Sequence, residues 1–183
     1  MALDSAQGYL CRPRSAVDSR MKTLTLVTGA DTDVLNRKAA PVVLPFSDEI
    51  RPLLDEMVII MRQEKGIGLA APQVGISQRI CVIEIDGLVS KYVNPEITSR
   101  SQEKIFFEEG CLSLPGQFFP IERHEEITVK YWNEKGLPKR IRANGLLAIV
   151  LQHEIDHLDG ILICKRYQRQ KSKQGKIYGR IIE

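Results

Sequence analysis

The clearest chemistry in the chain comes from two histidines and a glutamate in the sequence His153-Glu154-Ile155-Asp156-His157, which follows an apolar run over residues 145–152. On a helix successive residues turn by about 100°, so residues four apart lie on one face and their imidazoles can bind one metal ion. Glu154 lies beside that face, where a carboxylate can act as general base or acid without binding the metal. The chain has only three histidines, and Gly160 is a typical helix end. The pattern therefore predicts a helical metal site rather than a chance spacing.

The helix leaves the third protein ligand open. After His157 the chain has no further histidine, and its few acidic residues lie next to the helix or at the terminus. Cys164 is a downstream candidate, whereas His124 and Cys111 are the main candidates upstream. A lone cysteine is usually a buried structural residue, but two histidines that need a partner make Cys111 a strong alternative.

A segment of small residues, Gly66-Ile67-Gly68-Leu69-Ala70-Ala71-Pro72-Gln73, follows a predicted helix. Its glycines indicate that the backbone passes close to another group. The spacing fits neither a dinucleotide fingerprint nor a phosphate loop, because the glycine pattern and the Lys-Ser/Thr ending are absent. Gln73 is the polar residue of interest here, although a lone glutamine is usually a solvated loop residue.

Length and composition predict one ordinary globular domain. The chain has 183 residues, 43% of them hydrophobic and 27% charged, with a net charge of +3. No apolar stretch approaches the roughly 20 residues that cross a bilayer, so we expect no membrane association. The mild basicity gives no reason to expect DNA binding. Four widely spaced cysteines, Cys11, Cys81, Cys111 and Cys164, predict reduced thiols and a reducing compartment.

The hydrophobic pattern predicts an α+β fold with mainly antiparallel sheet, packed around the helix that carries the histidines. Apolar residues at helical spacing between Ile50 and Met61 predict an amphipathic helix near the N-terminus. Alternating or β-branched runs predict five strands, over residues 80–85, 92–94, 105–107, 127–132 and 139–142. Turns are predicted at residues 86–87, 94–95, 115–116 and 133–136.

The two ends of the chain look different from the domain between them. Residues 1–20 have no apolar period and lack the apolar centre of a secretory signal, so we predict an appended, disordered leader or tag. The domain is predicted to span residues 21–166. Residues 167–183 form a basic tail, and between residues 165 and 180 there are seven Lys or Arg and no acidic residue. We predict a solvated, frayed terminus, with a contact to ribosomal RNA or another polyanion as the alternative.

Three motifs in order make the sequence resemble the peptide deformylase family. They are the Gly66 to Gln73 segment, the sequence Glu109-Gly110-Cys111-Leu112-Ser113, and the His153 to His157 helix. The helical motif is shared with many metallohydrolases, whereas the combination is highly specific. The resemblance covers about residues 21 to 166.

The resemblance implies a role for each matching residue. Cys111, His153 and His157 would bind the metal, and Glu154 would be the general base and acid for a metal-bound water that attacks the formyl carbon. Gln73 and the backbone N–H of Leu112 would stabilise the oxyanion. The residues expected to bind substrate come from the three motifs and from apolar positions near them, and they are Gly66, Ile67, Gly68, Phe107, Glu109, Gly110, Ile149 and Val150.

The implied reaction is removal of the formyl group from N-formylmethionine at the start of nascent peptides, with release of formate. The resemblance implies Fe²⁺ as the resident metal, with Zn²⁺, Ni²⁺ or Co²⁺ able to substitute, whereas the residues alone suggest zinc. The expected partners are N-formylmethionyl peptides and, through the basic tail, the ribosome. The expected location is the bacterial cytoplasm, with an organelle as second choice.

Some residues depart from the family pattern or leave alternatives open. Arg123 is retained and is expected to have a structural or substrate-side role, whereas His124 replaces a common proline. Phe118 and Phe119 form either a rim of the cleft or part of the core. Two other functions are open: a metallopeptidase or amidase acting on another acyl group, and a metal-stabilised binding module that contacts RNA without turnover.

Overall fold

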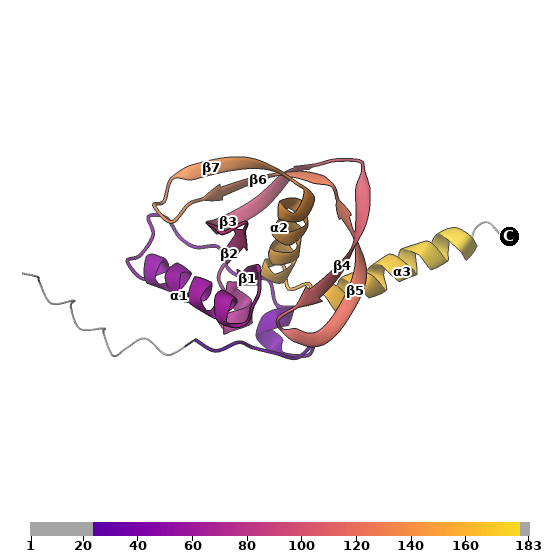
Figure 1. Ribbon diagram of the computed structural model, residues 1–183, viewed down its shortest axis with the longest axis horizontal. Helices are drawn as coiled ribbons and strands as arrows, with labels where there is room; N and C mark the ends of the chain where they lie inside the picture. Colours follow the sequence, from indigo (N-terminus) through magenta and orange to yellow (C-terminus); the bar gives the residue numbers. More distant parts are fainter. Residues whose placement is uncertain (1–23, 180–183) are drawn as a thin grey trace, which may run out of the picture.

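The computed structural model describes the backbone of residues 24–179 and the side chains of residues 24–172. The predicted leader, residues 1–20, lies outside the described residues. The described chain forms seven strands and three α-helices, confirming the predicted α+β class (Figure 1). In chain order the elements are α1 Ile50–Gln63, β1 Gly68–Ala70, β2 Ile80–Ile85, β3 Leu88–Arg100, β4 Lys104–Cys111, β5 Leu114–His124, β6 Glu126–Trp132, β7 Pro138–Asn144, α2 Gly145–Leu158 and α3 Ile163–Gly179, with short 3-10 turns at Asp33–Asn36 and Ala71–Val74.

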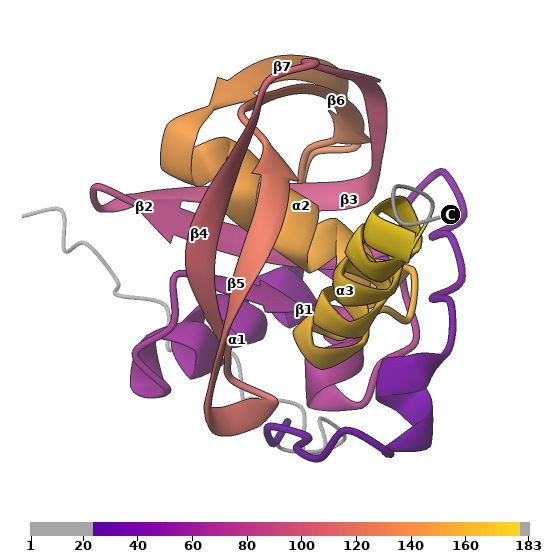
Figure 2. The same ribbon diagram turned by 90° about the vertical axis from the view of Figure 1, so that its right-hand side faces the viewer.

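The strands form two antiparallel sheets that flank the histidine helix. Five strands pair in the order β1-β2-β3-β6-β7, and β4 and β5 form a separate long hairpin. Helix α2 lies between the five-stranded sheet and this hairpin, while α1 covers the opposite face of the sheet (Figures 1 and 2). None of the described helices is long and apolar enough to cross a membrane.

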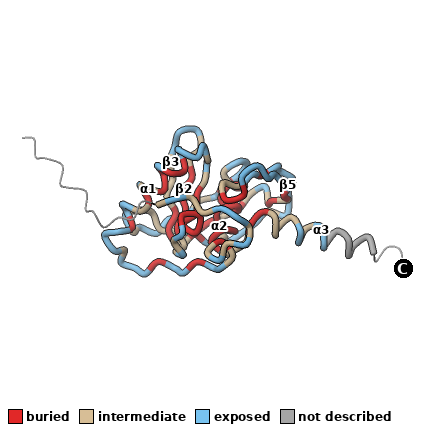
Figure 3. The backbone as a smooth tube through the Cα atoms, turned by 90° about the horizontal axis from the view of Figure 1, so that it is seen from below, coloured by how far each residue is buried: buried red, intermediate tan, exposed pale blue. Residues whose placement is uncertain are grey.

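Strand β2 shows why the sheet holds two helices. Its alternate residues face opposite sides, so Ile80 and Val82 pack with α1 while Cys81 and Ile83 pack with α2. All four residues are therefore buried, and the strand appears in the sequence as a continuous apolar run. Helix α2 is apolar or buried on nearly every side from Ala148 onward, and the buried segments gather around it (Figure 3).

Several predicted boundaries are confirmed. The amphipathic helix, the strand over residues 80–85 and the turn at residues 86–87 lie where the sequence placed them. Asp86 and Gly87 both have positive φ, which suits the two-residue turn of a β-hairpin. Helix α2 ends at Leu158, and Gly160 follows with φ +72°. A Cβ there would lie 2.8 Å from the backbone of Arg37, so only glycine allows this close approach.

Two predicted turns are wrong. Residues 94–95 and 115–116 lie within strands, at places where the pairing with the neighbouring strand is irregular. Asn94 and Pro95 lie inside β3, where the register with β6 shifts. Pro115 and Gly116 lie inside β5: the pairing passes from Gly110–Phe118 to Cys111–Leu114, so residues 115–117 bulge out without partners. The chain reverses instead at residues 112–113. Proline has no N–H to donate to a neighbouring strand, so it is tolerated at the open edge of a two-stranded hairpin.

The basic C-terminal segment continues from the domain as a helix as far as Gly179, which was not predicted from the sequence. Helix α3 begins at Ile163 and runs through the predicted domain limit at residue 166. The Tyr167 ring packs on Phe119 with centroids 5.3 Å apart, and Gln170 Nε2 donates to the Glu122 carbonyl at 3.1 Å. These contacts with β5 fix the start of α3. Whether the tail acts apart from the domain stays a prediction.

Asn94 provides a test of the bulge in β3. Its side chain accepts a hydrogen bond from the Val42 N–H and donates one to the Val42 carbonyl, both at 2.8 Å, and its φ is +51°. We expect Asn94→Ala to lower the free energy of unfolding by about 2–4 kcal/mol, because two hydrogen bonds are lost and alanine is strained at positive φ. Urea unfolding would measure this. Asn94→Gly loses the same hydrogen bonds without the strain, so it should be less destabilising than alanine; equal losses would show that the backbone conformation contributes nothing.

Candidate active site

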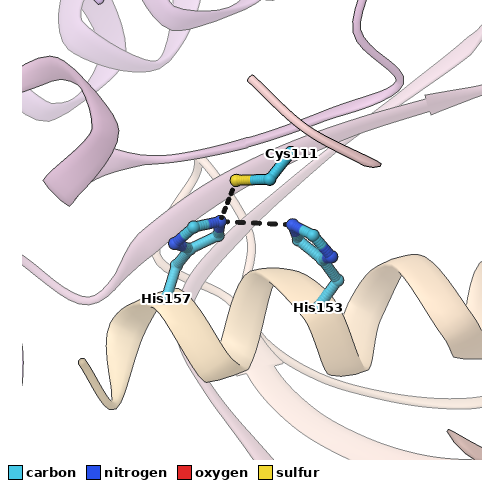
Figure 4. A group of neighbouring side chains, drawn as sticks. All are labelled: Cys111, His153 and His157. Carbon is cyan, nitrogen blue, oxygen red and sulfur yellow. Dashed lines mark hydrogen bonds between the residues drawn. The ribbon is translucent and has the colours of Figure 1, made fainter. Parts of the chain in front are cut away.

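Helix α2 and the end of β4 bring together three side chains of the kinds that bind metal ions. His153 and His157 lie one turn apart with their Nε2 atoms separated by 3.2 Å, and Cys111 Sγ lies 3.2 Å from Nε2 of His157. Figure 4 shows the three side chains pointing toward a common point, and their donor atoms all lie within 4.8 Å of one another. Ligands about 2.0–2.3 Å from a tetrahedral metal lie about 3.3–3.7 Å apart, so the cluster has nearly the required spacing.

The other candidate ligands lie elsewhere. His124 Nδ1 contacts the Ser101 carbonyl at 2.7 Å, at the far end of β5. Cys164 is half-buried on α3 and packs against the apolar cluster that contains Leu162, and its thiol is not part of the group formed by Cys111 and the two histidines. Within residues 24–172, Cys111 is thus the cysteine that joins the two histidines. Cys81, Cys111 and Cys164 are free thiols, as predicted, and Cys11 lies outside the described residues.

A buried ion-pair network orients His153. Glu109 Oε2 lies 2.8 Å from His153 Nδ1, and the Glu109 carboxylate accepts hydrogen bonds from Arg123 Nε and Nη2 at 2.6 and 2.8 Å. Arg123 also donates to Asp156 at 2.5 Å. The histidine ring is therefore held so that its Nε2 faces the other ligands, a common arrangement behind metal-binding histidines.

The network engages the carboxylate of Glu109, a residue expected to bind substrate. This carboxylate is buried, and both of its oxygens contact protein groups. A contact between Glu109 and substrate stays a prediction. Burial alone would raise the pKa of Glu109, but hydrogen bonds and positive charge from Arg123 and His153 lower it to about 2. Glu109 thus stays ionised and positions His153. Of the two roles expected for Arg123, the structure supports the structural one, because the side chain is 2% exposed.

The two histidines differ in their electrostatic surroundings. Burial would lower the pKa of His153, but the neighbouring Cys111 thiol and the carboxylates of Glu109 and Glu154 raise it to about 10. Burial and the positive charges of His153 and Arg123 lower the pKa of His157 well below its ordinary value. The surroundings of His153 therefore favour positive charge at its ring. Those of His157 keep its imidazole neutral, which is the form that binds metal.

Glu154 has the environment of an acid–base group. Its side chain is buried, and its Oε2 has no hydrogen-bond partner among the described residues. Burial raises the pKa of Glu154 to about 7; the charges of Glu109 and Asp156 add to this effect, and those of His153 and Arg123 oppose it. A carboxyl group with a pKa near the working pH can both accept and donate a proton.

Gln73 is buried rather than solvated. The Ala70 N–H donates to Gln73 Oε1 at 2.8 Å, which fixes the orientation of the amide. Gln73 Nε2 then points toward β4 and β5, 3.3 Å from Ser113 Oγ and 3.8 Å from Cys111 Sγ. The amide N–H groups therefore lie beside the cysteine.

A cavity of about 510 Å³ opens next to the metal-binding cluster. Every predicted catalytic and substrate-binding residue lines it, together with Cys111 and His153. Several lining residues were not predicted from the sequence, including Leu146 at the start of α2 and Lys65 before the glycine segment. Leu146 belongs to the apolar run before the histidines, so the helical spacing of that run could have predicted that Leu146 lines the cavity. Phe118 is an exposed part of the rim, while Phe119 packs against α3.

The glycine segment forms one wall of this cavity. Among the described strands, β1 is at the edge of the five-stranded sheet and pairs with β2 alone, so no described strand covers its other edge. A Cβ at Gly68 would lie 2.3 Å from Glu154 Oε1 and 2.9 Å from Val150 Cγ1. Glycine therefore allows β1 to pass directly over the carboxylate.

Comparison with known proteins agrees with this geometry. The sequence model of the polypeptide deformylase family matches residues 24–173. A peptide deformylase of Picosynechococcus sp. is 46% identical over 143 residues, which cover 75% of this chain and 76% of that protein. The crystal structure of peptide deformylase from Thermotoga maritima shares 40% identity with a TM-score of 0.75, covering 80% of this chain and 98% of the other. A class I type b peptide deformylase from Acinetobacter baumannii with bound Met-Ala-Ser is 34% identical, with a TM-score of 0.74 and coverage of 79% and 98%.

This chain belongs to the polypeptide deformylase family. It is therefore a metal-dependent hydrolase that removes the N-formyl group from N-formylmethionine of nascent polypeptides and releases formate. The resemblance seen in the three sequence motifs is confirmed.

Gly68 offers a test of the close approach to Glu154. We expect Gly68→Ala to lower kcat at least about a hundredfold, because the new methyl group displaces the carboxylate that handles the proton. Metal content should not change. Gly66→Ala is the matched comparison: the closest contact of its Cβ would be the flexible end of Leu112, at 2.7 Å, so the loss should be smaller. Formate release measures both variants, and equal activity of Gly68→Ala and the wild type would contradict the expected collision.

Proposed function

We propose that Cys111, His153 and His157 hold one Fe²⁺ ion and that Glu154 is the general base and acid of the deformylation reaction. The observation that carries this proposal is the convergence of one thiol and two imidazoles beside a buried carboxylate in an apolar cavity. A bound divalent metal supplies a Lewis acid that makes water nucleophilic at neutral pH. Thiolate ligation suits borderline or softer ions, so Zn²⁺, Ni²⁺ or Co²⁺ are expected to substitute.

In the proposed reaction Glu154 accepts a proton from the attacking water and passes it to the leaving amine. This transfer requires a carboxyl group with a pKa near neutrality and a free oxygen, and the pKa of about 7 and the unpartnered Oε2 support the assignment. Glu109, held by Arg123, keeps His153 in position throughout. The products are formate and a peptide with a free amino terminus.

Two donors are proposed to stabilise the oxyanion that forms on the formyl group. They are the side-chain amide of Gln73 and the backbone N–H of Leu112. Gln73 is fixed by the Ala70 N–H, so its donor requires no reorganisation during the reaction. Leu112 follows Cys111 directly and lines the cavity. Each such donor typically lowers the barrier by about 3 kcal/mol.

The substrate is proposed to lie along the open edge of β1. An extended peptide can add to an edge strand through main-chain hydrogen bonds, which suits residues Gly66 to Gly68. The methionine side chain would enter the apolar part of the cavity, whose proposed lining is Ile67, Phe107, Gly110, Ile149 and Val150. The related structure with bound Met-Ala-Ser, the peptide left by deformylation of formyl-Met-Ala-Ser, supports this choice of substrate.

The setting of the reaction is also part of the proposal. We propose that the protein acts in the bacterial cytoplasm, with an organelle as second choice, because its described cysteines are free thiols. A contact between the basic C-terminal segment and the ribosome would bring the site to nascent peptides. The support for this contact is the run of positive charge from residue 165 to residue 180.

Glu154→Gln tests the catalytic assignment. Iron-loaded protein, assayed anaerobically, should release formate from formyl-Met-Ala-Ser and much less acetate from the acetyl peptide. Glu154→Gln should lower kcat by about 10²–10⁴-fold while keeping the metal, because only proton transfer is lost. The control is Glu125→Gln, an exposed position remote from the cavity, which should behave as wild type. Absence of formate release from metal-loaded wild type would refute the reaction itself.

Cys111→Ser tests the metal ligands. Replacing the thiolate removes one of three protein ligands, so the metal content after dialysis against a weak chelator should fall to a small fraction of the wild-type value. Cys164→Ser and His124→Ala are the matched controls and should retain full metal content. Elemental analysis gives the stoichiometry, and loss of metal from Cys164→Ser instead would reject the proposed ligand set.

A further inference from the structure

A continuous chain of charged groups links helix α3 to a metal-binding histidine. It begins at His153, whose Nδ1 contacts Glu109, and continues through Arg123 to Asp156. On its other side Asp156 is bound by Arg166, in the first turns of α3. Each link is a hydrogen bond between two ionised groups or between a carboxylate and the imidazole. Movement of one side chain therefore alters the hydrogen bonds of the next side chain in the series.

With His153 neutral, as a metal-binding imidazole is, the charges of this chain balance once Arg166 is included. Glu109 and Asp156 supply two negative charges, and Arg123 alone supplies one positive charge between them. The Arg123 side chain is 2% exposed and the Asp156 side chain 11%, so water screens these charges poorly. Arg166, at the solvent side of the chain, supplies the second positive charge.

The geometry of Arg166 does more than neutralise Asp156. Its Nη2 donates to Asp156 Oδ1, and its Nε donates to Oδ2, the oxygen that also accepts from Arg123. A guanidinium bound through two N–H groups fixes the plane of a carboxylate as well as its position. Arg166 therefore sets the direction from which Asp156 holds Arg123, and Arg123 in turn holds Glu109.

Contacts on both sides of Arg166 fix the helix that carries it. Lys165 Nζ donates to Asn36 Oδ1 at 2.6 Å, Tyr167 packs on Phe119, and Gln170 donates to the Glu122 carbonyl. The guanidinium is thus presented from a docked helix, in contrast with the exposed Arg169 one turn further along. Asp156 itself lies between the two histidines on α2, directly before His157.

We propose that Arg166 is a positioning residue for the metal centre, acting through Asp156, Arg123 and Glu109 on the ring of His153. This inference rests on the proposed function of Cys111, His153 and His157 as metal ligands. It makes the basic C-terminal helix part of the site, because removal of its first arginine leaves the Asp156 carboxylate free to turn and weakens its hold on Arg123.

Metal affinity tests this role directly. Apparent dissociation constants for Co²⁺ are measured by competition with a chromophoric chelator, on wild type, Arg166→Gln and Arg166→Lys. Loss of an outer partner of a metal-binding histidine typically weakens affinity 10–100-fold, so we expect about tenfold for Arg166→Gln. Lysine keeps the charge but loses the second N–H contact, so Arg166→Lys should weaken binding by only about threefold. The thiolate-to-cobalt absorption band should shift in Arg166→Gln, since the ring of His153 changes orientation.

Arg169→Gln is the matched control. It removes the same charge from the same helix at an exposed position, and its Co²⁺ affinity should stay within about twofold of wild type. An equal loss in this control would show that the general charge of α3 is responsible and would overturn the inference. Far-UV circular dichroism and urea unfolding of the metal-free proteins separate positioning from folding. If Arg166→Gln does not fold, Arg166→Lys carries the same comparison.

The outcomes also separate this inference from the proposed function. Wild type that binds no Co²⁺ at one equivalent would refute the proposed metal site, and with it the role of Arg166. Wild type that binds, together with an Arg166→Gln variant that binds equally tightly and has an unchanged absorption band, would overturn the positioning role alone. A lower unfolding midpoint with unchanged affinity would show that Arg166 is only structural, which also overturns it.

Discussion

The ion pair between Arg123 and Glu109 is the constraint on which the rest of the structure depends. Both side chains are almost fully buried, and together they join the β4–β5 hairpin to helix α2 through Asp156 and His153. Removing one partner from a buried pair usually destabilises a protein by about 3–5 kcal/mol, a large part of the 5–15 kcal/mol that typically stabilises a domain. The same pair keeps the Glu109 carboxylate ionised against His153, so stability and the orientation of a metal ligand have one physical origin.

The two sheets serve different purposes around this pair. The five-stranded sheet is a scaffold: β2 is buried on both faces between α1 and α2, which fixes the helix that carries both histidines. The β4–β5 hairpin crosses the other side of α2 and delivers Cys111 from a tight chain reversal (Figure 2). A site assembled from two rigid elements is held more precisely than one on mobile loops, which suits chemistry that requires several donors at once.

The close approach of backbone to carboxylate explains the glycines of β1. Gly68 leaves room for Glu154, and the strand beyond it has an open edge. A larger residue would improve the strand itself, because glycine weakens strands. The cavity instead requires that β1 lie against the catalytic helix, so local strand propensity gives way to the geometry of the site.

The sequence by itself determined the fold class, the helix with its two histidines, most strand positions and, through three motifs together, the family. These features depend on local period and residue type: His153 and His157 share a helix face wherever that helix lies. Residue spacing alone left Cys111, His124 and Cys164 open as the partner of the two histidines, and the family motif pointed to Cys111. The tertiary structure supplies the physical reason, because the path of the hairpin places the Cys111 thiol beside both imidazoles. It also decided that the Glu109 carboxylate contacts His153. The residues at 94–95 and 115–116 became bulges, and the basic tail became a helix, since pairing with neighbouring strands and packing against β5 outweigh local turn and charge signals.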